Sequence, residues 1–194
     1  MASQVAICNL ALSKFGDIAI QAITDETKEA RACRVLWDLV RDGLIESYPW
    51  RFALKRVALG AALAAAPEFG FDYKYTLPAG CLRVWELYDS DSDWTIEGNE
   101  FYTSDEEPQI RYIAQITDST QFNPSFVKCF ATNLAAELCP KLTDNPKLRL
   151  ALLQELEVEI SKAYKTGAIE GNPPMHKDQQ GMDAGNFPWQ TEGR

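Results

Sequence analysis

A proline at position 49 separates two segments of different periodicity, and this junction limits the possible folds more than any other feature of the sequence. In residues 24–48, apolar residues recur at three- and four-residue steps, which predicts one long amphipathic helix. Residues 51–59 begin with an alternation of period two and predict a strand. Pro49 lacks an N–H and disfavours helical geometry at Tyr48, so we expect the helix to end there. The chain therefore passes directly from a helical layer into a β layer.

The long helix has a start signal and one apolar face. Thr24 and Asp25 are residue types that cap helix N-termini, and acidic residues in the first turn suit the helix dipole. Leu36 and Leu39 are apolar residues that lie outside the main stripe. The predicted buried face consists of Ala30, Cys33, Trp37, Val40, Leu44 and Tyr48.

Three further helices are predicted. The first covers residues 3–15 and ends at Gly16, a residue type common just after helix C-termini. The other two share a start signal, an asparagine N-cap followed by a proline at the first helical position. This signal occurs at Asn123-Pro124, before a helix over residues 125–139, and at Asn145-Pro146, before a helix to about residue 165.

Short strands fill the middle of the chain. Residues 60–70 are rich in alanine but lie between strand signals, and we expect a loop or a hairpin arm there. Strands are predicted over residues 51–59, 72–77, 82–88 and 109–116, with a hairpin over residues 93–103 that turns at Gly98-Asn99. This pattern predicts a small antiparallel sheet or sandwich.

The element order predicts the fold class and the domain organisation. We expect an α+β fold that is mainly helical: a four-helix bundle (residues 3–48 and 123–165), with an antiparallel β insert at about residues 50–117. Residues 1–166 then form one domain, with the sheet projecting from one end of the bundle. Residues 167–194 are rich in Gly, Pro, Gln and Asp without periodicity, and they predict an extended C-terminal tail.

The charge balance excludes several functions. A formal net charge of −9 disfavours a protein that coats nucleic acid or docks on anionic lipid, since both tasks need an excess of Lys and Arg. The five cysteines are widely spaced, without a CxxC or Cys/His cluster, so we expect reduced, buried thiols rather than a zinc site. We expect no signal peptide and no membrane span.

One acidic segment is similar to a calcium-binding loop. Asp89, Asp91 and Asp93 occupy positions one, three and five of an EF-hand-like pattern, and Glu100 occupies position twelve. Position six is Trp94 where the loop needs glycine, and the flanks predict strands instead of helices. A solvated acidic loop is the favoured interpretation, and a calcium-dependent binding module is kept as an alternative.

Catalytic motifs are weak. Two carboxylates flanking one cleft are needed by a glycosidase, and the chain offers the neighbours Glu106 and Glu107 and the helical series Glu155, Glu157 and Glu159. Glu155 and Glu159 are typical of a wet helix face. The only histidine, His176, lies in the predicted tail, which lacks the rigid setting of a catalytic triad. We therefore expect no enzyme activity and no cofactor, and keep a virion-associated cell-wall hydrolase as the alternative function.

The predicted tail contains two apolar groups within a polar composition. They are Pro173-Pro174-Met175 and Phe187-Pro188-Trp189. They are either incidental parts of a linker or anchors that dock on a partner. The second interpretation is favoured, because a free tail has little reason to contain Phe and Trp.

Several segments, in their order along the chain, resemble the podovirus tail tubular protein A family of head-to-tail adaptors. The first two are ICNLALSKFGD near the start and the long helix with its junction, RACRVLWDLVRDGLIESYPWRFALKR. The others are FGFDYKYTLPAGCLRV, WTIEGNEFYT and IRYIAQITDSTQFNPSFVKCFATNLAAEL. The resemblance covers about residues 3–165.

The resemblance implies a virion protein, made in the host cytoplasm, that forms a dodecameric ring between the portal and the tail nozzle protein. The ring extends the DNA channel, and DNA passes through it without sequence-specific binding. A net negative charge suits this role, because it repels phosphate. Neighbouring copies would meet through heterologous contacts that use apolar residues such as Leu36 and Leu39. Family C-terminal segments reach the portal, which implies portal-binding roles for Pro173, Pro174, Met175, His176, Phe187, Pro188 and Trp189.

Overall fold

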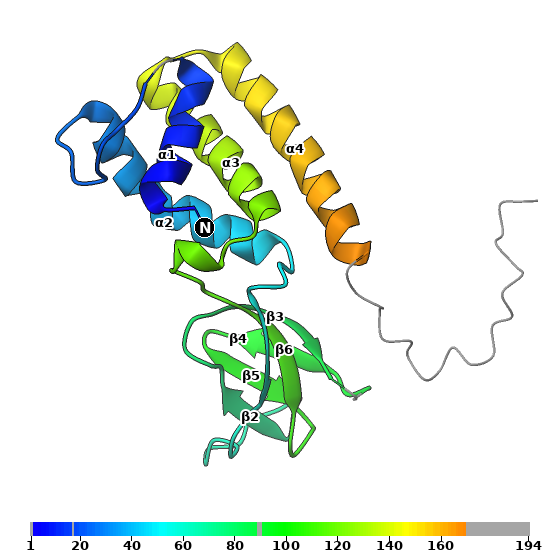
Figure 1. Ribbon diagram of the computed structural model, residues 1–194. Helices are drawn as coiled ribbons and strands as arrows, with labels where there is room; N and C mark the ends of the chain where they lie inside the picture. Colours follow the sequence, from blue (N-terminus) through cyan, green and yellow to red (C-terminus); the bar gives the residue numbers. More distant parts are fainter. Residues whose placement is uncertain (1, 17, 89–90, 170–194) are drawn as a thin grey trace, which may run out of the picture.

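The computed structural model describes residues 2–16, 18–88 and 91–169, and within them the protein has an α+β fold (Figure 1). The helices lie together at one end and the strands at the other. The helical elements are α1 (Gln4–Leu12), a 3₁₀ turn (Ser13–Phe15), α2 (Lys28–Ser47), a second 3₁₀ turn (Ser119–Gln121), α3 (Pro124–Leu142) and α4 (Pro146–Ile169). The strands are β1 (Leu54–Ala58), β2 (Tyr73–Thr76), β3 (Cys81–Leu87), β4 (Trp94–Glu97), β5 (Glu100–Thr103) and β6 (Gln109–Ala114).

Helix α3 is the centre of the helical layer, because α1, α2 and α4 each pack against it. Its sequence explains this position, since more than half of its residues are buried and small residues alternate with large ones. The start signals at Asn123 and Asn145 are confirmed. The Asn123 Oδ1 accepts a hydrogen bond from the Phe126 N–H at 2.7 Å, and the Asn145 Oδ1 accepts one from the Leu148 N–H at 3.2 Å.

The strands form two three-stranded antiparallel sheets, with strand orders β1-β6-β3 and β2-β5-β4. We name them sheet 1 and sheet 2. Their buried sides belong to one continuous hydrophobic cluster, together with the helical core. The predicted hairpin is confirmed: Glu97 pairs with Glu100, and Gly98 adopts φ +62°, which glycine accommodates without strain.

The predicted strand after Pro49 begins later than expected. Residues 50–53 form a tight turn in which the Trp50 carbonyl accepts hydrogen bonds from the N–H groups of Ala53 and Leu54. The alternation of Trp50 and Phe52 therefore does not indicate strand pairing. It places both rings in the core beside Phe126, with ring centroids 5.0 Å from that ring in each case. Helix α2 does end at Ser47, and Tyr48 is extended, as expected from Pro49.

A polar contact also joins the two layers. Arg41 of α2 is buried, and its guanidinium is bound by Asp38 at 2.6 Å and Asp42 at 2.8 Å. The Asp42 carboxylate also accepts a hydrogen bond from the Gln115 side chain, just after β6, at 2.8 Å. Because a buried guanidinium is costly without partners, this arrangement holds the end of β6 against α2.

Three predicted helix boundaries are wrong. Thr27 caps α2 through its Oγ1 and the Ala30 N–H, whereas Asp25 instead accepts hydrogen bonds from the N–H groups of Gln21 and Ala22. The helix α3 continues through Pro140 to Leu142, and α4 extends to Ile169, beyond the predicted helix end at about residue 165. Pro140 has no N–H to donate to the preceding turn, and α3 ends two residues after it.

Other expectations concern the cysteines and the membrane. All five cysteines are free thiols, and Cys81 is the one that is not fully buried. Burial raises the pKa of the Cys129 thiol to about 11, so it is unreactive at neutral pH. Among the described helices, none is long and apolar enough to cross a membrane.

The turn after Pro49 makes a direct prediction about stability. The Trp50 Nε1–H donates to the Leu44 carbonyl at 2.9 Å, and Trp50→Phe removes that hydrogen bond, although the Ser47 hydroxyl still donates to the same carbonyl at 2.9 Å. We expect a loss of about 1–3 kcal/mol in the free energy of unfolding, measured by urea denaturation, from the lost hydrogen bond and from the volume removed at a buried ring. Trp85→Phe is the matched control, because Trp85 is exposed on sheet 1, and its loss should stay within about 0.5 kcal/mol. Equal losses for the two variants would contradict this role of Trp50.

Candidate functional site

The predicted portal-binding residues lie outside the described part of the chain. This holds for Pro173, Pro174, Met175, His176, Phe187, Pro188 and Trp189. Asp89, the first residue of the calcium-like pattern, is also outside it. The described residues offer two other surfaces, one on the helical layer and one on sheet 1.

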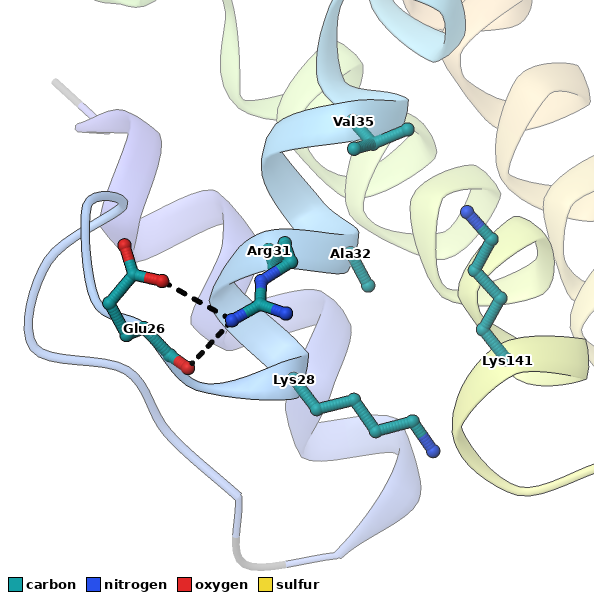
Figure 2. A pocket seen from close by; sticks show the side chains of 6 residues that line it. All are labelled: Glu26, Lys28, Arg31, Ala32, Val35 and Lys141. Carbon is teal, nitrogen blue, oxygen red and sulfur yellow. Dashed lines mark hydrogen bonds and ion pairs between the residues drawn. The ribbon is translucent and has the colours of Figure 1, made fainter.

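The first surface is a groove between the N-terminal half of α2 and the C-terminal end of α3, which we name the α2 groove (Figure 2). It has a volume of about 590 Å³ and is open to solvent. Its lining residues are Glu26, Lys28, Arg31, Ala32, Val35 and Lys141. The groove therefore has an apolar floor and a rim with more basic than acidic groups.

The charges of the rim are only partly neutralised. Figure 2 shows the Arg31 guanidinium directed toward Glu26, whose carboxylate it meets at 3.2 Å and whose backbone carbonyl it meets at 3.3 Å. Lys28 and Lys141 have no ion-pair partner among the described residues and project beside the opening. In a chain of net charge −9, the groove is thus locally basic.

An exposed apolar stripe continues along α2 from the floor of this groove. Val35 is 63% exposed and Leu39 is 74% exposed, although both are on a helix whose opposite face is buried. Their spacing of four residues puts them on one side of α2. Leu39 is thus free for contact, as expected from its place outside the main stripe, whereas Leu36 is half-buried against the core. We name Val35 and Leu39 the α2 stripe.

The second surface is the outer side of sheet 1, which we name the arginine face. Arg56, Arg111 and Glu86 stand in one cross-strand row on β1, β6 and β3, and Arg111 binds Glu86 at 2.7 Å. Arg56 lies over the ring of Tyr88, 5.9 Å from its centroid. The sequence pattern did not reveal this surface, because its basic residues come from three separate strands.

The β3 strand completes the arginine face at its irregular point. The register shifts between Val84 and Glu86, and the extra residue is Trp85. A bulge of this kind turns a side chain away from the core, and Trp85 is accordingly exposed. Arg83 lies 5.1 Å from the centroid of the Trp85 ring. The face therefore combines three arginines with two exposed aromatic rings.

A group of acidic residues lies where the loops around sheet 2 meet. The Ser92 Oγ donates to the Asp105 carboxylate at 2.6 Å, which brings the loop before β4 against the loop before β6. Both loops expose further carboxylates, and we name these the acidic edge. Its members are Asp91, Asp93, Glu106 and Glu107.

Two of the three carboxylates predicted on α4, Glu155 and Glu159, form surface ion pairs. Glu155 binds Lys14 at 2.6 Å, and Glu159 binds Lys162 at 2.8 Å. The hydrogen bond from Lys162 lowers the pKa of Glu159, so this carboxylate stays ionised near neutral pH. The α2 groove contains one carboxylate, and so does a smaller hollow between α3 and α4 that includes Glu159. Neither hollow brings together the two carboxylates that glycoside hydrolysis needs.

Metal binding has no support in the described part of the chain. No group of three His, Cys, Asp or Glu side chains there has a geometry that could hold a metal ion. Glu100, the twelfth residue of the calcium-like pattern, is instead bound to the Tyr102 hydroxyl at 2.7 Å and to Lys74 at 3.5 Å. The bond to Glu100 raises the pKa of Tyr102 to about 12.

Comparison with known proteins gives no relative: no family model matches the chain, and no curated protein matches it significantly.

The exposure of the α2 stripe predicts which apolar residues of α2 contribute to folding. Leu39→Ser should change the free energy of unfolding by less than about 0.5 kcal/mol, because Leu39 buries little surface in the single chain. Leu44→Ser, on the same helix, should cost about 2–5 kcal/mol, because Leu44 is buried. Chemical denaturation of both variants checks this. A large loss for Leu39→Ser would mean that it is a core residue.

Proposed function

We propose that the protein is a structural head-to-tail adaptor of a tailed bacteriophage, one subunit of a ring between the portal and the tail nozzle. The observation that supports this most directly is the α2 stripe, which exposes two large aliphatic residues on the rigid helical layer. Exposed apolar residues of this kind, next to a groove with polar rims, are typical of protein–protein contact sites. The order of segments that resembles the tail tubular protein A family supports the same function.

In this proposal the four helices act as one rigid bundle that meets its neighbours in the ring. The α2 stripe of each copy contacts a different surface on the next copy, so that the contact is heterologous and can close a dodecamer. The free subunit stays monomeric if the portal is needed as a template. The locally basic α2 groove beside the stripe favours an acidic surface on whichever molecule covers it.

Residues 170–194 are proposed to bind the portal. They follow directly after α4, so they start at the end of a 24-residue helix and comprise 25 residues. A chain of that length spans at most about 90 Å when extended, which is enough to reach a neighbouring ring. The groups Pro173-Pro174-Met175 and Phe187-Pro188-Trp189 supply the apolar anchors.

A virion-borne hydrolase finds less support in the described residues. Of the carboxylates that it would use, Glu155 and Glu159 are ion-paired on α4 and Glu106 and Glu107 lie at the acidic edge, and neither hollow described above contains two carboxylates. Glu155→Gln and Glu159→Gln should therefore leave particle assembly and infectivity close to wild type. Loss of peptidoglycan clearing with normal particle assembly would instead support the hydrolase.

Ring formation is tested by mixing the protein with the phage portal and measuring the complex by native mass spectrometry. We expect many copies per portal, and the double variant Val35→Asp with Leu39→Asp should strongly reduce that number, because burying an unpaired carboxylate at the contact costs its hydration. Val158→Asp, at an exposed apolar residue of α4, is the matched control and should bind as the wild type does. A single wild-type copy per portal would exclude a ring.

The tail is tested by deleting residues 170–194. The deletion should leave thermal stability nearly unchanged, because the core described above lies before residue 170. Portal binding should be greatly weakened, since burying an aromatic such as Trp189 contributes on the order of 2 kcal/mol at an interface. The double variant Phe187→Ala with Trp189→Ala should reproduce part of the loss. Full portal affinity in the truncated protein would make the tail a spacer only.

A further inference from the structure

We propose that the arginine face of one subunit binds the acidic edge of a neighbouring subunit, as a second contact of the ring in the β layer. This inference rests on the proposed ring function and names the surfaces that would meet. The α2 stripe could contribute contacts in the helical layer, and the arginine face would contribute them at the other end of the molecule.

The arginine face has charges that the described residues do not neutralise. Arg111 has Glu86 as its ion-pair partner, but Arg56 and Arg83 have no carboxylate partner among the described residues. Each of these two instead lies against an exposed aromatic ring, which restricts the side chain and lowers the entropy lost on binding. Sheet 1 contains the basic residues Lys55, Arg56, Arg83 and Arg111 and the single acidic residue Glu86.

The acidic edge has negative charges that lack ion-pair partners in the same part of the structure. None of Asp91, Asp93, Glu106 and Glu107 forms an ion pair within the described part of the chain. The bond between Ser92 and Asp105 holds the two loops together, so these carboxylates are presented as one surface. These neighbouring carboxylates repel one another, and guanidinium groups brought opposite them would reduce that repulsion.

The composition of the arginine face favours a protein over a nucleic acid. Arg, Trp and Tyr are the residue types that contribute most to protein–protein binding. Duplex DNA would meet a molecule of net charge −9, in which the acidic edge lies on the same β layer as the arginines. A second copy of this chain supplies the needed carboxylates in a fixed one-to-one ratio.

The contact also fits the symmetry of a ring. Because the two surfaces differ, each copy can use its arginine face with one neighbour and its acidic edge with another, and such a contact is heterologous, as ring closure requires. Opposite charges would steer the copies into one orientation, and the exposed Trp85 and Tyr88 would add apolar burial once the surfaces meet.

Engineered disulfides test which surfaces meet. Arg56→Cys protein is mixed with Glu106→Cys protein at high concentration under mild oxidation, which traps even weakly populated contacts. We expect a mixed disulfide to form at least about tenfold faster than with the control partner Glu46→Cys, an exposed position on α2. Equal rates with the two partners overturn the proposal. Cys81, the one native cysteine that is not fully buried, is replaced by serine throughout.

The double variant Arg56→Cys with Glu106→Cys separates a ring-type contact from a closed dimer. A heterologous contact links each copy to two others, so oxidation should give a ladder of covalent species on a non-reducing gel. A product that stops at the dimer overturns the heterologous arrangement.

Charge-reversal variants test whether the charges of the two surfaces meet. Arg56→Glu with Arg83→Glu, and separately Glu106→Arg with Glu107→Arg, should each slow cross-linking between cysteines placed at Tyr88 and Asp93 by about tenfold or more. When the two reversed proteins are mixed, the wild-type rate of cross-linking should return. In the mixture, the native acidic edge of the first protein can meet the native arginine face of the second, and the two reversed surfaces are again opposite in charge. Failure of the mixture to recover means that the charges do not meet.

The outcomes also separate this inference from the adaptor function. Cross-linking between these surfaces with no multiple binding to the portal would support the contact and reject the adaptor. Many copies per portal with no cross-linking above control would support the adaptor and reject this contact.

Discussion

The packing of four aromatic rings between the helical and β layers determines how the rest of the structure can be arranged. Trp50 and Phe52 lie where the chain leaves the helices, and Phe122 and Phe126 lie where it returns. The rings of Phe122 and Phe126 are 4.7 Å apart, and both Trp50 and Phe52 contact Phe126. Because the outgoing and returning segments share one cluster, the β layer is fixed at both of its connections and cannot swing freely on a single linker.

This arrangement explains why the sequence predicted some elements well and misplaced others. The caps at Asn123 and Asn145 and the turn at Gly98-Asn99 depend on a few adjacent residues, and local chemistry was sufficient to find them. The turn at residues 50–53 depends on Phe126, more than seventy positions away, so its alternation resembled a strand. The α2 start was misplaced for a similar reason, because Thr24, Asp25 and Thr27 are all suitable caps and tertiary packing selects one.

The candidate surfaces were predictable to different degrees. The position of Leu39 outside the helical stripe indicated its exposure, but Leu36 was placed outside the stripe in the same way and is half-buried against the core, so helical periodicity only partly decides which residues face it. The arginine face had no comparable signal: it needs the pairing of Arg56 with Arg111 and Arg111 with Glu86, and a bulge that exposes Trp85. Strand register is set by long-range pairing, so the sequence alone does not show which residues become neighbours on the sheet. A negative net charge also gives no sign of a local basic surface.

The division of charge within the β layer matters more for association than the total of −9. Identical subunits with a uniform negative surface repel one another, and salt alone screens that repulsion beyond about 8–10 Å. Sheet 1 carries arginines and the acidic edge carries carboxylates that have no ion-pair partner among the described residues, and in the proposed ring this division would convert part of the repulsion into directional attraction. The overall negative charge would then discourage binding to DNA, while the local asymmetry would select one orientation between neighbours. The aromatic cluster at Phe126 would make that selection effective, because it holds the charged surfaces of the β layer in a fixed relation to the α2 stripe.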